Sequence, residues 1–95
     1  MTPRVRKALE ASIKHWERNV TGKTSTIGSK NCALCRLFIT KDCVGCPVRN
    51  RTGKPFCDGS PYPIANKMGN QYGYDSLRFR QAALRELRFL ESLRP

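Results

Sequence analysis

The chain has 95 residues, of which 18 are Lys or Arg and 7 are Asp or Glu, so its formal charge at neutral pH is +11. This length predicts one domain, residues 1–95, with a modest hydrophobic core. No apolar run approaches the roughly 18 residues that cross a bilayer, and the N-terminus has no apolar segment of the kind that directs secretion. We therefore expect a cytoplasmic protein without a membrane partner, and the charge indicates a polyanion or an acidic protein surface as its partner.

The N-terminal segment has the pattern of an amphipathic helix, which we expect to span residues 3–19. Thr2 supplies a capping hydroxyl, and Pro3 suits the first helical position, where no backbone donor is needed. Apolar residues recur every three or four positions on one face, which predicts the buried side: Val5, Leu9, Ile13, Trp16 and Val20. We expect Trp16 to be a core anchor that covers the cysteines, rather than a stacking platform for a ligand.

Residues 21–31 are rich in Thr, Ser, Gly and Lys, which predicts a connecting loop. The loop contains Gly22-Lys23-Thr24, the last three residues of a phosphate-binding P-loop. The first glycine of that motif would fall at Glu17, and a helix precedes the loop where a strand is required. The sequence therefore excludes nucleotide hydrolysis at this loop.

All five cysteines fall between residues 32 and 57, in the order Cys32-x2-Cys35-x7-Cys43-x2-Cys46-x10-Cys57. Two C-x-x-C pairs can supply the four soft ligands of a tetrahedral zinc site, and the cytoplasm keeps thiols reduced. We therefore predict that four of the five cysteines bind zinc. An iron-sulfur cluster needs the same thiolates, but the spacing matches neither ferredoxin pattern.

The spacing does not choose the four ligands. Either the two C-x-x-C pairs form the site, or Cys57 enters it and one other cysteine is left out, with Cys43 the first candidate. His15 is the one imidazole that could also bind zinc, but the cysteines already exceed the four positions.

The segment around the cysteines, residues 32–62, reads as turns held by metal. The apolar run in residues 33–40 predicts a short strand or hairpin arm. Proline and glycine then recur every few residues, and Arg49, Arg51 and Lys54 lie on a predicted exposed basic loop. Beyond it, residues 60–74 show no clear pattern except a short helical turn near residues 64–68. Their three tyrosines are expected to cap the core rather than stack on nucleic-acid bases: Tyr62, Tyr72 and Tyr74.

The C-terminal segment predicts a second amphipathic helix over residues 76–93, capped by Asp75 or Ser76. Its broad apolar side should be buried: Phe79, Ala82, Ala83, Leu87, Phe89, Leu90 and Leu93. Another side, without an acidic residue, forms what we call the arginine face: Arg78, Gln81, Arg85, Arg88 and Ser92. Arginines at this spacing can meet phosphates or carboxylates, although a merely solvated helix surface has the same pattern.

The sequence thus predicts a small α-rich, metal-stabilised domain, in which two amphipathic helices flank a loop-rich zinc-binding middle with at most a short hairpin. We expect no enzyme activity. The single histidine has no evident carboxylate partner, and a zinc ion saturated by cysteines has no open position for water or substrate.

Three runs in the middle of the chain carry a resemblance: NCALC at residues 31–35, CVGCPV at 43–48 and TGKPFCDGSPY at 52–62. Together they resemble small cysteine-rich proteins encoded by bacteriophages, which are similar in having a His-Trp pair near the end of a preceding helix, here His15 and Trp16. The likeness covers roughly the first two thirds of the chain. It implies a phage origin, a bacterial host cell as location and a metal-binding segment, and it implies no reaction. Ser60 stands where the pattern has Thr, which keeps the hydroxyl.

Two functions fit these features. The first is a zinc-stabilised basic nucleic-acid-binding protein, which the charge favours. The second is a phage protein that binds and inhibits or redirects a host complex such as RNA polymerase, a nuclease or a DNA-targeting defence system, which the resemblance favours. Six basic residues are the candidates for either interaction: Arg78, Arg85, Arg88, Arg49, Arg51 and Lys54.

Overall fold

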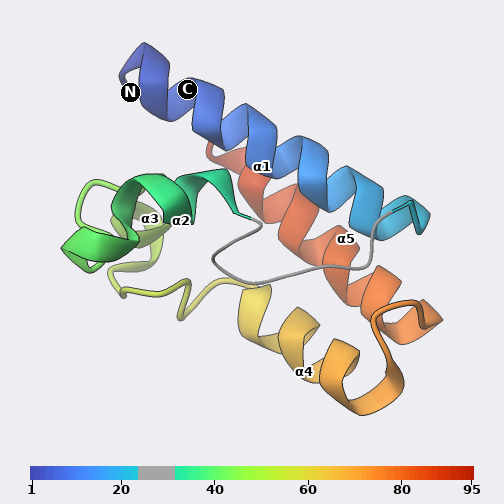
Figure 1. Ribbon diagram of the computed structural model, residues 1–95. Coiled ribbons are helices and arrows are strands. Elements are labelled where there is room, and N and C mark those ends of the chain that lie inside the picture. The colour runs from blue at the N-terminus through green and yellow to red at the C-terminus, as the bar shows by residue number, and fades with distance from the viewer. Residues whose placement is uncertain (24–31) are drawn as a thin grey trace.

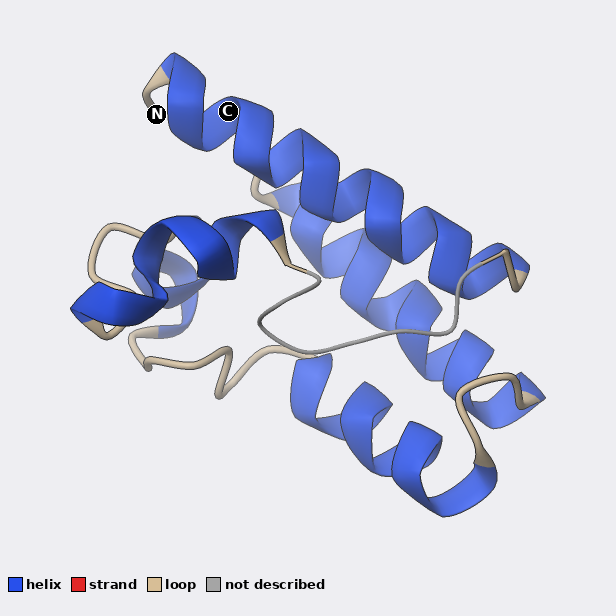
Figure 2. Ribbon diagram, viewed as in Figure 1, coloured by secondary structure: helices blue, strands red, loops and turns tan. Residues whose placement is uncertain are grey.

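The computed structural model describes residues 1–23 and 32–95, so residues 24–31 of the loop predicted at residues 21–31 lie outside the described residues. Within these two ranges the chain forms helices and turns and no strand (Figure 2). The elements in chain order are α1 (Pro3–Thr21), α2 (Ala33–Phe38), the 3-10 turn η2 (Ile39–Lys41), α3 (Pro47–Thr52), α4 (Tyr62–Tyr72) and α5 (Leu77–Ser92).

Helix α5 is the centre of the fold, because α1 packs along one side of it and α4 along another (Figure 1). The short helices α2 and α3 lie beside this group of three long helices, and α2 contacts α1. No helix in the described ranges is long and apolar enough to cross a membrane.

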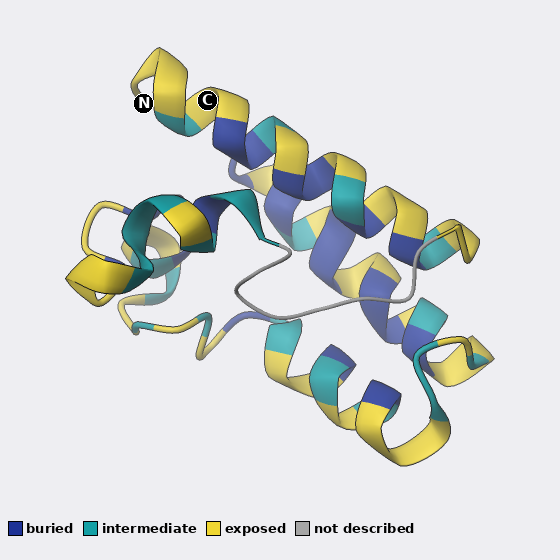
Figure 3. Cartoon of the chain, viewed as in Figure 1, coloured by how far each residue is buried: buried dark blue, intermediate teal, exposed yellow. Residues whose placement is uncertain are grey.

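The buried sides of α1 and α5 face each other, as the periodicity of both segments predicts (Figure 3). Leu9 and Ile13 of α1 are almost fully buried, as is Phe79 of α5. The ring of Trp16 lies 6.4 Å from that of Phe79, so the tryptophan is a core anchor, as expected. Val5 and Val20, at the two ends of the apolar side of α1, are only half-buried.

Both long helices begin at the caps that the sequence predicts. The Thr2 hydroxyl accepts a hydrogen bond from the Val5 amide at 3.2 Å, and the Ser76 hydroxyl accepts one from the Phe79 amide at 3.1 Å. Ser76, not Asp75, is therefore the cap of α5. Helix α1 ends at Gly22, whose φ of 82° is the left-handed conformation that glycine adopts without strain.

The prediction of a strand in residues 33–40 is wrong, because this run forms α2 and most of the turn η2. Helical winding places Leu34 against α1, where only 1% of its surface stays exposed. The apolar residues Leu37, Phe38 and Ile39 are each half-buried around the same core. Burial against a neighbouring helix outweighs the β-favouring composition of so short a run.

The prediction of little regular structure in residues 60–74 is also wrong, because α4 occupies 11 of these residues. Pro61 and Pro63 lie at the start of the helix, where a missing backbone donor costs nothing, so they begin the helix instead of marking turns. Ala65 and Gly69 are buried toward α5. A β-carbon at Gly69 would overlap the ring of Tyr74.

This close approach predicts that Gly69→Ala destabilises the protein. In an exposed helix the change would stabilise by up to about 1 kcal/mol, whereas overpacking against the Tyr74 ring should cost about 1–3 kcal/mol. Denaturant unfolding measures the difference. Gln71→Ala, at an exposed position of the same helix, is the control and should change stability by less than about 0.5 kcal/mol. An increase in stability for Gly69→Ala would contradict the packing described.

Candidate metal centre and basic surface

All five cysteines line one cavity of about 200 Å³. The cysteine segment (residues 32–62) forms much of its wall, α1 contributes His15 and Trp16, and α5 contributes Glu86 and Leu90. Most of the remaining wall is apolar. The structure therefore brings together cysteines that are up to 25 positions apart in the sequence, counted from Cys32 to Cys57.

Each cysteine occupies a defined position in the segment. Cys32 precedes the first residue of α2 and Cys35 lies within that helix, whereas Cys46 precedes α3. Cys43 and Cys57 lie in turns and have φ values of 65° and 63°. These are left-handed conformations that non-glycine residues adopt at a cost of about 1 kcal/mol or more, so the surrounding structure must hold them.

The cysteine side chains influence one another directly. The pKa of Cys35 depends on two neighbouring thiols. Contact with Cys32 lowers it, but contact with Cys57 and burial raise it more, so that the pKa of Cys35 is about 12. Contact with Cys35 and burial raise the pKa of Cys32 far above its usual range, and burial raises the pKa of Cys46. The neutral thiol is thus favoured at Cys32, Cys35 and Cys46, and a nearby cation would reverse this preference.

Two hydrogen-bond contacts tie the sulfur atoms to the fold. The Phe56 amide donates to Cys43 Sγ at 3.4 Å. The hydroxyl of Ser12, a buried residue of α1, lies 3.7 Å from Cys32 Sγ and accepts a bond from the Leu34 amide at 3.4 Å. Ser12 thereby joins α1 to the start of α2. The sequence indicates this position, because helical periodicity places Ser12 at the border of the apolar side of α1.

Glu86 is the residue of the cavity that the sequence did not single out. Its side chain comes from the buried side of α5, only 2% of the residue is exposed, and its Oε1 atom has no hydrogen-bond partner. Burial, with a smaller effect of the nearby Cys32, raises the pKa of Glu86 to about 8. Glu86 lies four residues after Ala82 and four before Leu90, so the helical periodicity of the sequence places it on the buried side of α5.

The five cysteines are free thiols. Among the described residues, no three His, Cys, Asp or Glu side chains are arranged so that they could hold a metal ion. The sulfur atoms therefore share a cavity and affect one another's protonation without forming a ready-made coordination site.

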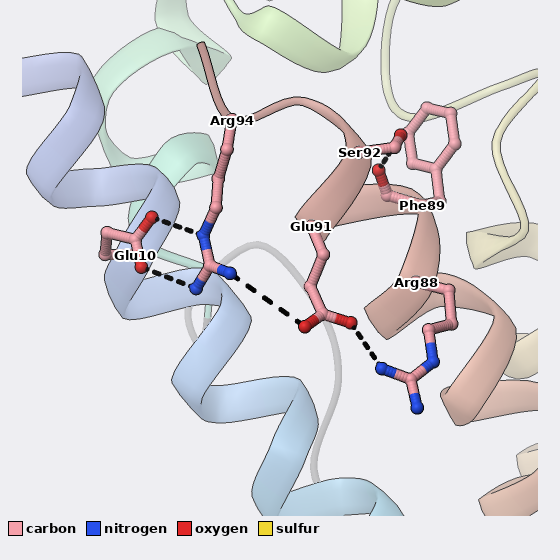
Figure 4. Close-up of polar contacts among 6 residues, drawn as sticks. All are labelled: Glu10, Arg88, Phe89, Glu91, Ser92 and Arg94. Carbon is pink, nitrogen blue, oxygen red and sulfur yellow. Dashed lines mark hydrogen bonds and ion pairs between the residues drawn. The ribbon is translucent and has the colours of Figure 1, made fainter.

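The three predicted arginines of α5 have different surroundings. Arg88 pairs with Glu91 at 2.9 Å, so an acid at the edge of the arginine face engages one of its members. Arg78 lies over the ring of Tyr72, with its guanidinium carbon 4.4 Å from the ring centre. Arg85 is exposed. Figure 4 shows that Glu91 also faces Arg94, which binds both carboxylate oxygens of Glu10 on α1 at 2.8 Å.

The predicted basic loop is partly helical, because Arg49 and Arg51 belong to α3. Arg49 donates to the Asp42 carbonyl oxygen at 2.6 Å, and Lys54 is exposed. Arg51 donates to the Ser92 hydroxyl at 3.4 Å and to the Ser92 carbonyl oxygen at 3.3 Å. Because Ser92 ends the arginine face, Arg51 extends that face onto the cysteine segment.

The expectation that the three tyrosines cap the core is confirmed for two of them. The Tyr62 ring lies 6.1 Å from that of Trp16, and the Tyr74 ring lies 5.2 Å from that of Phe79. Tyr72 differs, because 42% of its surface is exposed.

In comparisons with known proteins, no family model, curated protein or solved structure matches the chain. The resemblance to bacteriophage proteins therefore stays a prediction from the sequence runs that carry it.

The raised pKa of Glu86 predicts a pH-dependent stability. The folded chain keeps the Glu86 proton between its ordinary pKa of 4.5 and the folded value of about 8, whereas the unfolded chain has lost it. The stability that the protonated carboxyl contributes is complete below about pH 4.5 and is lost as the pH rises through about 8.

Glu86→Gln removes this titration and keeps the shape of the side chain. Melting temperatures of metal-free wild type and variant, measured side by side from pH 4 to 9, should diverge in favour of the variant as the pH rises. Comparing the two proteins at each pH cancels the titrations that they share. A difference that stays constant over the whole range would show that Glu86 does not hold its proton in the folded chain.

Proposed function

We propose that this is a zinc-stabilised basic nucleic-acid-binding protein without catalytic activity, in which the metal holds the cysteine segment in place and the arginine face contacts phosphates. The contact between Arg51 and Ser92 carries the proposal, because it joins the two features. Through it, the segment that the metal would hold also completes the basic surface.

The donor set of the cavity fits zinc. Four thiolates are the usual ligands of a closed structural zinc site, and all five thiols of the chain line this one cavity. The carboxyl of Glu86, whose Oε1 atom has no hydrogen-bond partner, lies in the same cavity, and a cation there would stabilise its charged form. When bound, zinc would stabilise the deprotonated thiols and supply on the order of 10 kcal/mol toward folding of a small domain.

The spacing of the cysteines does not decide whether Cys57 is a zinc ligand, but its contacts support that role. Its side chain is in hydrogen-bond contact with that of Cys35, which belongs to both candidate ligand sets, whereas Cys43 affects Cys35 only through charge. We therefore assign the zinc site to the set that includes Cys57 and leaves out Cys43: Cys32, Cys35, Cys46 and Cys57. The Cys43 sulfur, which accepts the Phe56 amide, would support the site from beside it.

The charge of the protein supports a polyanionic partner. The ion pairs among the described residues engage only two arginines, Arg88 and Arg94, so most of the positive charge in this part of the chain has no acidic partner there. From Arg78 to Ser92 the arginine face extends about 20 Å along α5, and Arg51 continues it. A row of guanidinium groups of this length can contact several phosphates of one strand.

A second candidate function is docking on an acidic surface of a host protein complex. Two exposed leucines of α5 favour it, because Leu77 and Leu84 are 67% and 39% exposed and border the arginine face. Apolar side chains beside arginines are typical of protein interfaces. Removal of nucleic acid from a cell lysate distinguishes the two functions, since a protein partner would stay bound.

The zinc site predicts one zinc ion per chain. Elemental analysis of protein purified under reducing conditions should find this ratio, and a strong chelator should lower the melting temperature and reduce the helical circular dichroism signal. Metal-free protein with an unchanged melting temperature would contradict the site. A brown protein with visible absorbance would indicate an iron-sulfur cluster instead.

The assigned ligands predict that single substitutions differ sharply. Cys35→Ser and Cys57→Ser should lose zinc and stability, whereas Cys43→Ser should keep close to one zinc ion per chain. Zinc content of the three purified variants measures this. Loss of zinc in Cys43→Ser together with its retention in Cys57→Ser would show that the two C-x-x-C pairs form the site.

The arginine face predicts salt-sensitive binding. Replacing Arg78, Arg85 and Arg88 with Gln should preserve the fold, because exposed charges contribute little to stability. Binding of labelled single-stranded and duplex oligonucleotides should weaken. The slope of log affinity against log salt should fall by roughly 0.7 to 0.9 for each phosphate that the variant no longer neutralises.

A second triple variant is the matched control for this experiment. Changing Arg4, Lys7 and Lys14 to Gln removes the same charge from the exposed side of α1 and should weaken binding less. Equal weakening in both triple variants would show that net charge, not the arginine face, determines binding. Absence of salt-sensitive binding by the wild type would refute the nucleic-acid function.

A further inference from the structure

Tyr72 and Arg78 form an exposed stacked pair where α4 turns into α5. The guanidinium carbon of Arg78 lies 4.4 Å from the centre of the Tyr72 ring, and Arg78 Nη1 donates to the Tyr72 hydroxyl at 3.1 Å. Both residues are exposed, and 42% of the tyrosine is accessible to solvent. The Arg78 guanidinium thus lies over one face of the exposed ring, and the pair presents planar aromatic and guanidinium groups to solvent.

The fold does not need Tyr72 for its core, since the neighbouring Tyr74 has that role. The Tyr74 ring packs edge-on against Phe79, and its hydroxyl hydrogen-bonds with the side-chain oxygens of Asn70 at 2.5 Å and Asn66 at 3.2 Å. These contacts fix the turn between α4 and α5. The stacked pair therefore lies beside a turn that these contacts hold, and both of its residues are exposed.

A surface of this kind suits an unpaired nucleic-acid base. Every base has a flat π-face that stacks on aromatic rings and on the planar guanidinium group of arginine. In a duplex these faces are occupied by neighbouring bases, so only a single strand can offer one. Arg85 lies two helical turns, or about 10 Å, along α5 from Arg78, where it can meet a phosphate of the same strand.

We propose that Tyr72 and Arg78 form a base-stacking site, so that the nucleic acid bound by the arginine face is single-stranded. This rests on the proposed nucleic-acid function and gives it a substrate class. Arg78 then has two roles, because it stacks on the tyrosine and also brings positive charge to the strand.

The test compares a ligand with bases to one without. Wild type, Tyr72→Leu and Tyr72→Phe are titrated into fluorescently labelled oligo-uridine and oligo-thymidine, into a duplex of the same length, and into inorganic polyphosphate as competitor. Tyr72→Leu should bind both single strands at least about five-fold more weakly, because one base can no longer stack. Tyr72→Phe keeps the ring and should bind like the wild type. Polyphosphate affinity should be the same for all three proteins.

Arg78→Lys provides a second variant that does not disturb α4. It keeps the charge and loses the planar group, so it should weaken single-strand binding while polyphosphate binding is retained. Circular dichroism checks that each variant is folded.

The outcomes separate the stacking site from the wider proposal. Wild-type protein that binds neither oligonucleotides nor polyphosphate at low salt would overturn the nucleic-acid function together with the stacking site. Salt-sensitive oligonucleotide binding that Tyr72→Leu and Arg78→Lys leave unchanged would overturn the stacking site alone. Equal weakening of single-strand and polyphosphate binding would also overturn it, because the effect would then be electrostatic.

Discussion

The packing of the cysteine segment against α1 and α5 is the contact on which both candidate sites depend. Few residues of the segment are fully buried, namely Leu34, Val48 and two of the cysteines, and its other core residues are only partly buried. Four non-glycine residues in it, in two adjacent pairs, have left-handed backbone conformations: Asp42, Cys43, Phe56 and Cys57. Such a segment needs an additional constraint, and a metal ion shared by its thiols would be one.

The same contact links the interior of the protein to its surface. On the inside, the segment closes a cavity in which the thiols meet Glu86 of α5. On the outside, α3 places Arg51 on Ser92, at the end of α5. Any change that loosens the segment should therefore alter the thiol cavity and the basic surface together, which connects metal content with binding in the proposed function.

The two long terminal helices could be predicted from the sequence because their signals are local. Thr2 and Ser76 are caps with clear residue preferences, and the apolar residues of each helix repeat at helical intervals. Helix α4 could not be predicted in the same way, because Pro61 and Pro63 suit turns as well as the first turn of a helix. The prediction of a strand at residues 33–40 was wrong, because the β-preference of so short a run is weak and the burial of Leu34 against α1 favours a helix.

The candidate sites were predictable only in part. The clustering of cysteines is visible in the sequence, and the structure places all five on one cavity. The buried state of Glu86 depends on the packing of α5, and the Arg51–Ser92 contact joins residues 41 positions apart, so neither follows from local patterns. The contrast between exposed Tyr72 and half-buried Tyr74 likewise depends on how α4 meets α5.

Titration of the reduced, metal-free protein with Co²⁺ is the decisive test of the cysteine metal site, because the absorption spectrum of cobalt reports the identity and geometry of its ligands. We expect saturation at one ion per chain, with intense thiolate-to-cobalt charge-transfer bands, the visible bands of a tetrahedral site, and displacement by one equivalent of Zn²⁺. Weak octahedral bands, or no spectral change on adding cobalt, would contradict this site.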